Sequence, residues 1–363
     1  MPRRQFLAVA GGAACSLTAP GAPVSAASGG WQGQEGGGVR RLTHPGLLDL
    51  QVNGFAGVDF NDPATTVERV GEAIAAMRAR GVTRFLPTLI TSSFDAFQRC
   101  AATLLRADGA AIAGIHMEGP YISPEDGARG AHPREHTAPA SLDDFERRQD
   151  AAGGRIRLVT LAPEVPGALP LIEHLRAAGV RAAIGHTAAS PEQIRDAVRA
   201  GATFSTHLGN GCANMLPRHP NFLWEQLAAD ELLASLIVDG HHLPPATVKS
   251  MVRAKTPSRV VLVTDATAAA GQPPGEYELG GLKVVLDANG RVAAPGQPNL
   301  AGSALSLDRA VGNVVRFAGV PLEEALAMAS TRPAAYLGVE PAGSLDLEWD
   351  PAAFSLRVLR ATG

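Results

Sequence analysis

Four polar side chains at the ends of short apolar segments have the types that bind a divalent metal ion and move protons beside it. They are Glu118, His186, His207 and Asp265. One carboxylate and two imidazoles suit Zn²⁺ or a similar ion and leave one coordination position open for water. Such an ion lowers the pKa of bound water towards ~7, so a nucleophile forms at neutral pH. Asp265 would take the water proton and deliver it to a leaving group; its alternative role is the N-cap of a following helix.

The residues that the chain lacks indicate that this site holds one metal ion. The three lysines are at positions 249, 255 and 283, and none lies near the predicted strand that ends at Glu164. A carboxylated lysine bridging two metal ions is therefore excluded there. Gln51 and Asn53 stand where a binuclear site would need two histidines, and amides bind zinc poorly. We expect one divalent ion, Zn²⁺ first, with Fe²⁺ and Co²⁺ as alternatives that the same ligands accept.

Eight short apolar segments, most of them followed by a helical pattern, are the elements that must position these side chains. Runs that are apolar on both faces are typical of a parallel sheet covered by helices. The pattern predicts an α/β fold, a TIM-like (β/α)8 barrel, in which the carboxyl ends of the strands form one rim. The predicted strands cover residues 47–52, 85–90, 111–117, 156–162, 182–185, 202–206, 233–238 and 260–264.

Histidines gather at the ends of these predicted strands. Any one of them could be a hydrogen-bonded core histidine, but five of the ten in the chain share this placement, and together they indicate a site. They are His116, His186, His207, His241 and His242. Helices are predicted over residues 66–80 and 169–179, and Ser190-Pro191 and Pro244-Pro245 mark two helix starts.

Composition excludes several classes of protein. The 363 residues are 45% hydrophobic, which is enough for a sizeable core, and the net charge of -3 argues against a nucleic-acid partner. No apolar run reaches the ~18 residues of a membrane span. The three cysteines, Cys15, Cys100 and Cys212, are too far apart for a disulfide framework or a CxxC zinc site.

The chain divides into four predicted segments. Residues 1–28 contain Arg3-Arg4, a short apolar stretch and the small-residue site Val24-Ser25-Ala26, which predicts a twin-arginine export signal and a periplasmic or cell-envelope location. The alternative is an over-extended start site on a cytoplasmic protein. Residues 29–44 are a linker with a remnant of a small β domain, residues 45–340 form the barrel, and residues 341–363 supply a C-terminal strand segment.

The ordered motifs from residue 45 to residue 338 resemble the amidohydrolase superfamily and, within it, the N-acetylglucosamine-6-phosphate deacetylases. The resemblance implies removal of the N-acetyl group from an amino sugar, with N-acetylglucosamine-6-phosphate converted to glucosamine-6-phosphate and acetate. The motifs that carry it are Asp49-Leu50-Gln51-Val52-Asn53-Gly54, Leu86-Pro87-Thr88, His116-Met117-Glu118-Gly119-Pro120, Leu161-Ala162-Pro163-Glu164, Gly185-His186-Thr187, Thr206-His207-Leu208, Asp239-Gly240-His241-His242, Thr264-Asp265-Ala266 and Ala301-Gly302-Ser303.

The resemblance also implies a role for each matching residue. Glu118, His186 and His207 match the metal ligands, Asp265 the general base and acid, and His132 the histidine that polarises the substrate carbonyl. Arg218 matches an arginine that reaches the phosphate site of a neighbouring subunit, which implies a homodimer; its alternative is a solvated loop charge. The positions that match substrate-binding residues are Ala131, Asn210, Gly211 and His242.

Three features depart from the family pattern. The loop Gly209-Asn210-Gly211-Cys212 replaces an aromatic residue followed by Asn-Ala-Met, so an amidohydrolase acting on another N-acyl amine or on a cyclic amide without phosphate is the alternative. The small β domain looks reduced, because residues 354–359 offer one strand and the segment before Pro45 offers little strand pattern. An export signal also conflicts with a phosphorylated sugar, which is normally cytoplasmic. A non-catalytic binding barrel is a further alternative, but the four site residues argue against it.

Overall fold

The structure, a computed structural model, describes residues 38–213, 215–296 and 299–363. The predicted export signal over residues 1–28 lies outside this range, as do residues 29–37 of the predicted linker. No helix in the described part of the chain is long and apolar enough to cross a membrane.

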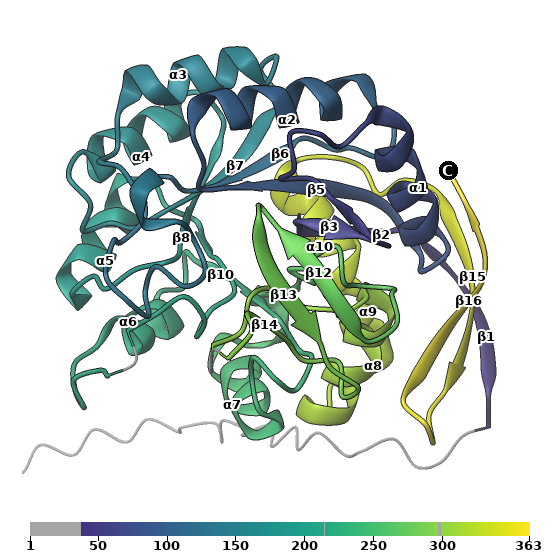
Figure 1. The fold of residues 1–363 in the computed structure, drawn as a ribbon. Helices are drawn as coiled ribbons and strands as arrows, with labels where there is room; N and C mark the ends of the chain where they lie inside the picture. The colour runs from purple at the N-terminus through teal and green to yellow at the C-terminus, as the bar shows by residue number, and fades with distance from the viewer. Residues whose placement is uncertain (1–37, 214, 297–298) are drawn as a thin grey trace, which may run out of the picture. The chain divides into compact units, whose positions relative to one another are not determined.

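Eight parallel strands form the central sheet, so the predicted barrel is confirmed. Figure 1 shows helices packed around this sheet. Their order is β11-β10-β9-β8-β7-β6-β5-β2. Three backbone bonds at the ends of the two edge strands close the barrel: the Asp265 N–H donates to the Gln51 carbonyl at 2.9 Å, and the Asn53 and Gly54 N–H groups donate to the Ala266 carbonyl at 2.8 and 3.0 Å. The strands are β2 (Leu47–Val52), β5 (Val82–Ile90), β6 (Ile115–Glu118), β7 (Ile156–Leu161), β8 (Arg181–Ile184), β9 (Phe204–Ser205), β10 (Leu233–Leu236) and β11 (Val260–Leu262).

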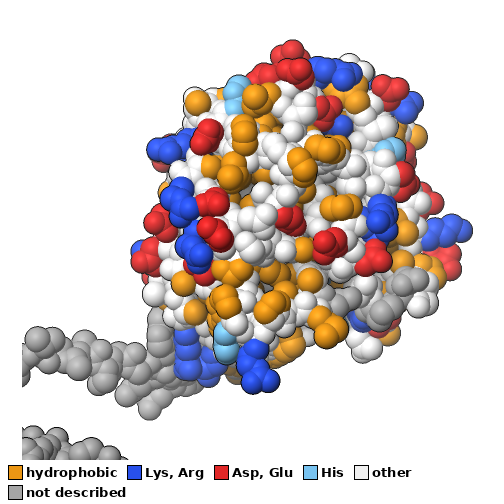
Figure 2. Space-filling model, turned by 90° about the vertical axis from the view of Figure 1, so that its left-hand side faces the viewer, with side chains coloured by type: hydrophobic (Ala, Val, Ile, Leu, Met, Phe, Trp, Pro, Cys, Tyr) orange, Lys and Arg blue, Asp and Glu red, His pale blue; other side chains and the backbone are white. Residues whose placement is uncertain are grey.

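Helices cover the outer face of the barrel and explain why its strands are apolar on both sides. Every residue of β2 is buried, because one face meets the barrel interior and the other meets helices. In Figure 2, acidic and basic side chains are interspersed over the side where α5 and α6 lie in Figure 1. The helices are α1 (Val67–Arg78), α2 (Phe94–Arg106), α3 (Leu142–Ala151), α4 (Ala168–Ala177), α5 (Pro191–Ala200), α6 (Phe222–Ala228), α7 (Pro245–Lys255), α8 (Leu307–Ala318), α9 (Leu322–Ala329) and α10 (Thr331–Leu337).

The local helix signals in the sequence act as expected. Thr66 caps α1 by accepting from the Arg69 N–H. Ser190 caps α5 in a capping box, and the helix begins at Pro191. α7 begins at Pro245. These starts depend on side chains next to them in sequence, which is why the sequence alone predicts them.

A three-stranded antiparallel sheet joins the two ends of the described chain, where the sequence indicated one strand. It contains β1 (Arg40–Pro45), β15 (Ser344–Asp350) and β16 (Ser355–Thr362), with β15 in the centre. β1 is mostly polar and has no buried residue, so its strand form depends on pairing with β15 rather than on its own pattern. The segment before Pro45 therefore forms a strand although it carries little strand pattern of its own.

A second three-stranded sheet, drawn in green in Figure 1, was not predicted. Its strands come between β11 and α8 in the sequence. It is formed by β12 (Gly275–Leu279), β13 (Leu282–Leu286) and β14 (Val292–Ala293). Its buried residues form a small cluster of their own with Ala269 and Ala301, separate from the main core. A short hairpin, β3 (Gly54–Phe55) and β4 (Val58–Asp59), follows β2.

Candidate active site

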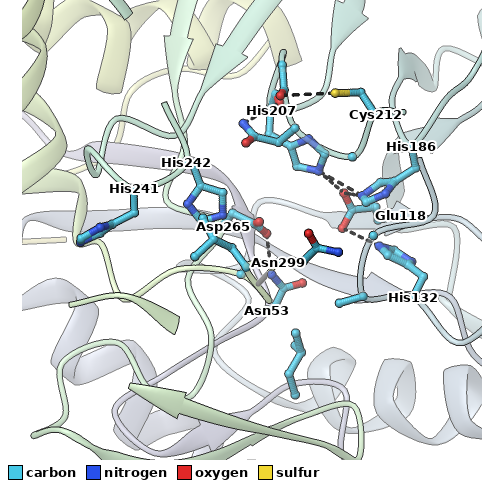
Figure 3. Close-up of a pocket in the computed structure, with 18 of the residues that line it drawn as sticks. Asn53, Glu118, His132, His186, His207, Cys212, His241, His242, Asp265 and Asn299 are labelled. Atoms are coloured by element: carbon cyan, nitrogen blue, oxygen red, sulfur yellow. Dashed lines mark hydrogen bonds and ion pairs between the residues drawn. The ribbon is translucent and has the colours of Figure 1, made fainter. Parts of the chain in front are cut away.

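Glu118, His186 and His207 converge at the carboxyl end of the barrel (Figure 3). Glu118 is the last residue of β6, and the two histidines follow β8 and β9. The Glu118 Oε1 atom lies 3.0 Å from His207 Nε2 and 3.3 Å from His186 Nε2, and the two nitrogens are 3.1 Å apart. Tetrahedral bonds of roughly 2.0–2.1 Å to one zinc ion put its ligands about 3.3 Å apart, so this spacing fits a single ion.

The environment of His186 and the backbone conformation of both histidines also suit metal binding. His186 Nδ1 lies 3.0 Å from the Ala128 carbonyl, and donating there leaves Nε2 with its lone pair turned towards Glu118. His186 and His207 have φ values of 50° and 29°, and Asp265 has 51°. Left-handed backbone is uncommon outside glycine and collects at functional sites, where it turns a side chain into the site.

Asp265 lies beside this cluster and is held by two amides. Its Oδ1 atom accepts from Asn53 Nδ2 at 2.7 Å and from Gln51 Nε2 at 3.1 Å. The same Gln51 nitrogen donates to Glu118 Oε1 at 2.9 Å, so one amide joins the acid to the metal cluster. Burial and the neighbouring Glu118 charge raise the pKa of Asp265 to about 6. The alternative of a helix N-cap is wrong, because the next described helix, α8, begins at Leu307.

His132 lies against the same cluster and is buried. Its ring centroid is 4.2 Å from that of His186, and its Nε2 atom is 3.8 Å from Glu118 Oε2. Its Nδ1 atom bonds Thr91 Oγ1 at 2.8 Å. Burial and His186 lower the pKa of His132 to about 3, so the imidazole is neutral at physiological pH.

These residues line a cavity of about 540 Å³. All of the predicted site residues except Arg218 line it, including Ala131, Asn210, Gly211 and His242. Arg218 is exposed on the loop before α6 and does not line the cavity of its own chain. Sequence reasoning missed several other lining residues, which come from loops and from the ends of β5 and β12: Ile90, Gly127, Leu279, Arg291, Asn299 and Leu300.

Gly211 allows its loop to approach the metal cluster. A Cβ atom at this position would lie 2.7 Å from His186 Nδ1, and the residue has a φ of +55°. Both conditions favour glycine over a residue with a Cβ atom. Gly211, which stands where the family pattern has alanine, therefore lets the loop backbone lie closer to His186 than a residue with a Cβ atom would.

Two carboxylates to which sequence reasoning gave no role, Asp239 and Asp49, accept hydrogen bonds from segments that carry site residues. Asp239 accepts from His242 Nδ1 at 2.7 Å and from the His241 and His242 N–H groups at 2.8 Å, which orients the loop after β10.

Asp49 accepts from Thr264 Oγ1 at 2.6 Å, across the barrel closure, and from the Gln51 N–H at 3.2 Å within its own strand. Burial raises the pKa of Asp49 to about 7. The available signal for Asp49 was a lone acid within an apolar strand.

Two residues that the strand-end pattern singled out lie outside the cavity lining. His116 is a core histidine that bonds Thr160 Oγ1 at 2.8 Å, and burial lowers its pKa to about 4. Glu164 accepts from the Thr187 hydroxyl at 2.5 Å and from the Ala188 N–H at 2.6 Å, so it holds the loop after β8. Strand-end position alone did not separate these structural residues from the site.

The fold and the site define a metal-dependent hydrolase, and the chain belongs to the Amidohydrolase family, whose model matches residues 42–356. Among its relatives, an N-acetylgalactosamine-6-phosphate deacetylase of Escherichia coli O157:H7 is 38% identical over 82% of this chain and 79% of its own. An N-acetylglucosamine-6-phosphate deacetylase of Lysinibacillus sphaericus is 34% identical, covering 87% of this chain and 81% of its own.

The fold is also similar to solved structures. A mutant N-acetyl-D-glucosamine-6-phosphate deacetylase of Mycobacterium smegmatis, in complex with N-acetyl-D-glucosamine-6-phosphate, has a TM-score of 0.80 and 32% identity, covering 88% of this chain and 85% of its own. An enamidase with 13% identity and a TM-score of 0.53 shares the fold alone.

Proposed function

We propose that this protein hydrolyses the N-acetyl amide of an amino-sugar 6-phosphate, with N-acetylglucosamine-6-phosphate as the first candidate and glucosamine-6-phosphate and acetate as products. The observation that carries the proposal is the convergence of Glu118, His186, His207 and Asp265 in one cavity. Deacetylases of such sugar phosphates among the relatives support it. The substrate needs a nucleophile, a polarised carbonyl and a proton for the departing amine.

The side chains of this chain account for these needs. A divalent ion, when held by Glu118, His186 and His207, activates water and polarises the amide carbonyl. Asp265 accepts the proton of the attacking water. A bond then forms between the water oxygen and the carbonyl carbon, the carbon–nitrogen bond breaks, and Asp265 returns the proton to the amine. His132 donates from Nε2 to the carbonyl oxygen when Thr91 donates to its Nδ1 atom.

We further propose that the metal is zinc and that the active form is a homodimer. The ligand set accepts Fe²⁺ and Co²⁺ as well, so metal analysis of the purified protein decides its identity. In the dimer, Arg218 of one subunit would reach the phosphate held by Asn210, Gly211 and His242 of the other. Sedimentation analysis tests this, and a monomer with full activity on the phosphorylated sugar would contradict it.

The export signal predicted over residues 1–28 leads to a proposed location in the periplasm or cell envelope, with the cytoplasm as the alternative. Fractionation of cells that produce the full chain, with and without Arg3 and Arg4 changed to lysine, tests the location. Loss of export in the lysine variant supports the signal. Recovery of both proteins in the cytoplasm contradicts it.

The decisive experiment for the activity is a steady-state assay of acetate release by the zinc-loaded protein. Its substrates are N-acetylglucosamine-6-phosphate, N-acetylgalactosamine-6-phosphate and their unphosphorylated forms. Turnover of a 6-phosphate supports the proposal, and no turnover of either above background would remove it. The galactosamine substrate is included because a relative of that name is 38% identical. The changed Gly209–Gly211 loop favours testing other N-acyl amines and cyclic amides as the second candidate class.

A further inference from the structure

We propose that Arg291, in the turn between β13 and β14, binds the anionic group of the substrate from within the same chain. This inference rests on the proposed function and adds a specificity residue to it. Neither the metal cluster nor the motifs of the sequence analysis include Arg291.

The cavity has charge of opposite sign in different parts. Glu118 and Asp265 supply carboxylates at the metal end. Arg291 is the one arginine or lysine side chain among the described residues that line the cavity. Since the carboxylates repel an anion that is not bound to the metal, a substrate phosphate is stabilised beside Arg291 rather than beside them.

The turn that carries Arg291 is attached to the loop after β10. The Arg291 N–H donates to Asp287 Oδ1 at 3.0 Å, and the Asp287 N–H donates to the Arg291 carbonyl at the same distance. Two residues earlier, the Asn289 carbonyl lies 3.0 Å from His241 Nε2. In Figure 3, His241 and His242 lie on the far side of Asp265 from the metal cluster. The turn is therefore held beside His241, whose neighbour in sequence, His242, is one of the residues proposed to hold the phosphate.

The geometry of the substrate matches this arrangement. The amide on C2 and the phosphate on C6 project from different sides of a pyranose ring. An amide at the metal cluster therefore sends the phosphate towards another part of the cavity. A guanidinium group binds phosphate oxygens through two parallel N–H donors, which makes arginine better suited than lysine to hold and orient this group.

The experiment compares Arg291→Gln with Arg309→Gln, an exposed arginine on α8 outside the cavity. Both variants and the wild type are assayed on an N-acetylhexosamine 6-phosphate and on the same sugar without phosphate. We expect Arg291→Gln to raise KM for the phosphorylated substrate about tenfold to hundredfold, with kcat nearly unchanged. The unphosphorylated sugar and Arg309→Gln should show no such change. Arg291→Lys should recover part of the loss.

A binding measurement separates this inference from the proposed reaction. Titration calorimetry with glucosamine-6-phosphate and with inorganic phosphate uses wild type, Arg291→Gln and Arg218→Gln. Weaker phosphate binding in Arg291→Gln supports the inference even if the wild type releases no acetate, an outcome that would remove the reaction alone. Equal losses on phosphorylated and unphosphorylated sugars, or unchanged binding in Arg291→Gln, would overturn it. A loss confined to Arg218→Gln would assign the phosphate to the partner subunit instead.

Discussion

The two ends of the cavity are held in different ways. At the metal end, Glu118, His186 and His207 are buried at or just beyond strand ends, and Gln51 and the Ala128 carbonyl bond the first two of them. At the outer end, His241 is exposed and belongs to the loop after β10. Barrel enzymes commonly separate chemistry on strand ends from specificity in loops. We therefore expect substitutions at the metal end to remove activity and those at the outer end to change the preferred substrate.

The largest effect should come from His207→Ala. Removing one of three ligands costs most of the metal affinity and, with it, several kcal/mol of transition-state stabilisation, so turnover should fall about 10³-fold or more. Metal content by mass spectrometry and acetate release measure the two effects. His116→Ala is the matched control for losing a buried histidine near the site. A His207→Ala protein that keeps both stoichiometric metal and activity would contradict the ligand assignment.

Asp265→Asn should come next and should separate proton transfer from metal binding. We expect the variant to keep its metal and to lose about 10²- to 10⁴-fold in kcat, because asparagine cannot accept the water proton.

The pH profile sharpens this test. In the wild type, kcat/KM should fall as the pH drops below about 6, where Asp265 becomes protonated and can no longer act as a base. The acidic limb should be absent in the residual activity of Asp265→Asn. The same limb in both proteins would show that another group titrates.

A third prediction concerns stability at the barrel closure. The folded pKa of Asp49 is raised from 3.8 to about 7, so its contribution to stability is complete below pH 4 and is lost as the pH rises to about 7. At about 1.4 kcal/mol per pKa unit, this contribution is about 4 kcal/mol. Asp49→Asn should remove this part of the pH dependence in urea unfolding. Asp143→Asn, on the exposed side of α3, should leave it intact. Parallel stability curves for wild type and Asp49→Asn would refute the prediction.

The smallest effect is expected for Gly211→Ala, in the loop Gly209-Asn210-Gly211-Cys212 that contacts the metal end. The left-handed backbone costs about 1–2 kcal/mol for a residue with a Cβ atom, and that atom would press on His186. Gly319→Ala has a similar φ of +73° and nothing within 4 Å, so it reports the backbone cost alone. Chelator competition should show weaker metal binding in Gly211→Ala than in Gly319→Ala. Equal metal affinities would mean that the loop does not position His186.

The sequence predicted those parts of the fold whose signals are local. Strands apolar on both faces, proline and serine at helix starts, and histidines after strands are visible within a few residues. The strands of the small sheets carried weaker signals: β1 is polar and depends on β15, about 300 positions away, and β12 to β14 bury a small cluster of their own. His132 showed no periodicity, so its burial against His186 could not be inferred from its neighbours in sequence.

By itself, the sequence determined the barrel, the side chains with metal-binding chemistry and the order in which they occur along the chain. Only the tertiary structure decided which of them meet. Gln51 bridges Glu118 and Asp265, which lie 67 and 214 positions away, while Arg218 stays outside the cavity and Arg291 enters its lining. The physical reason is that periodicity reports burial of each segment, whereas contacts between distant side chains depend on how the barrel closes and how its loops pack.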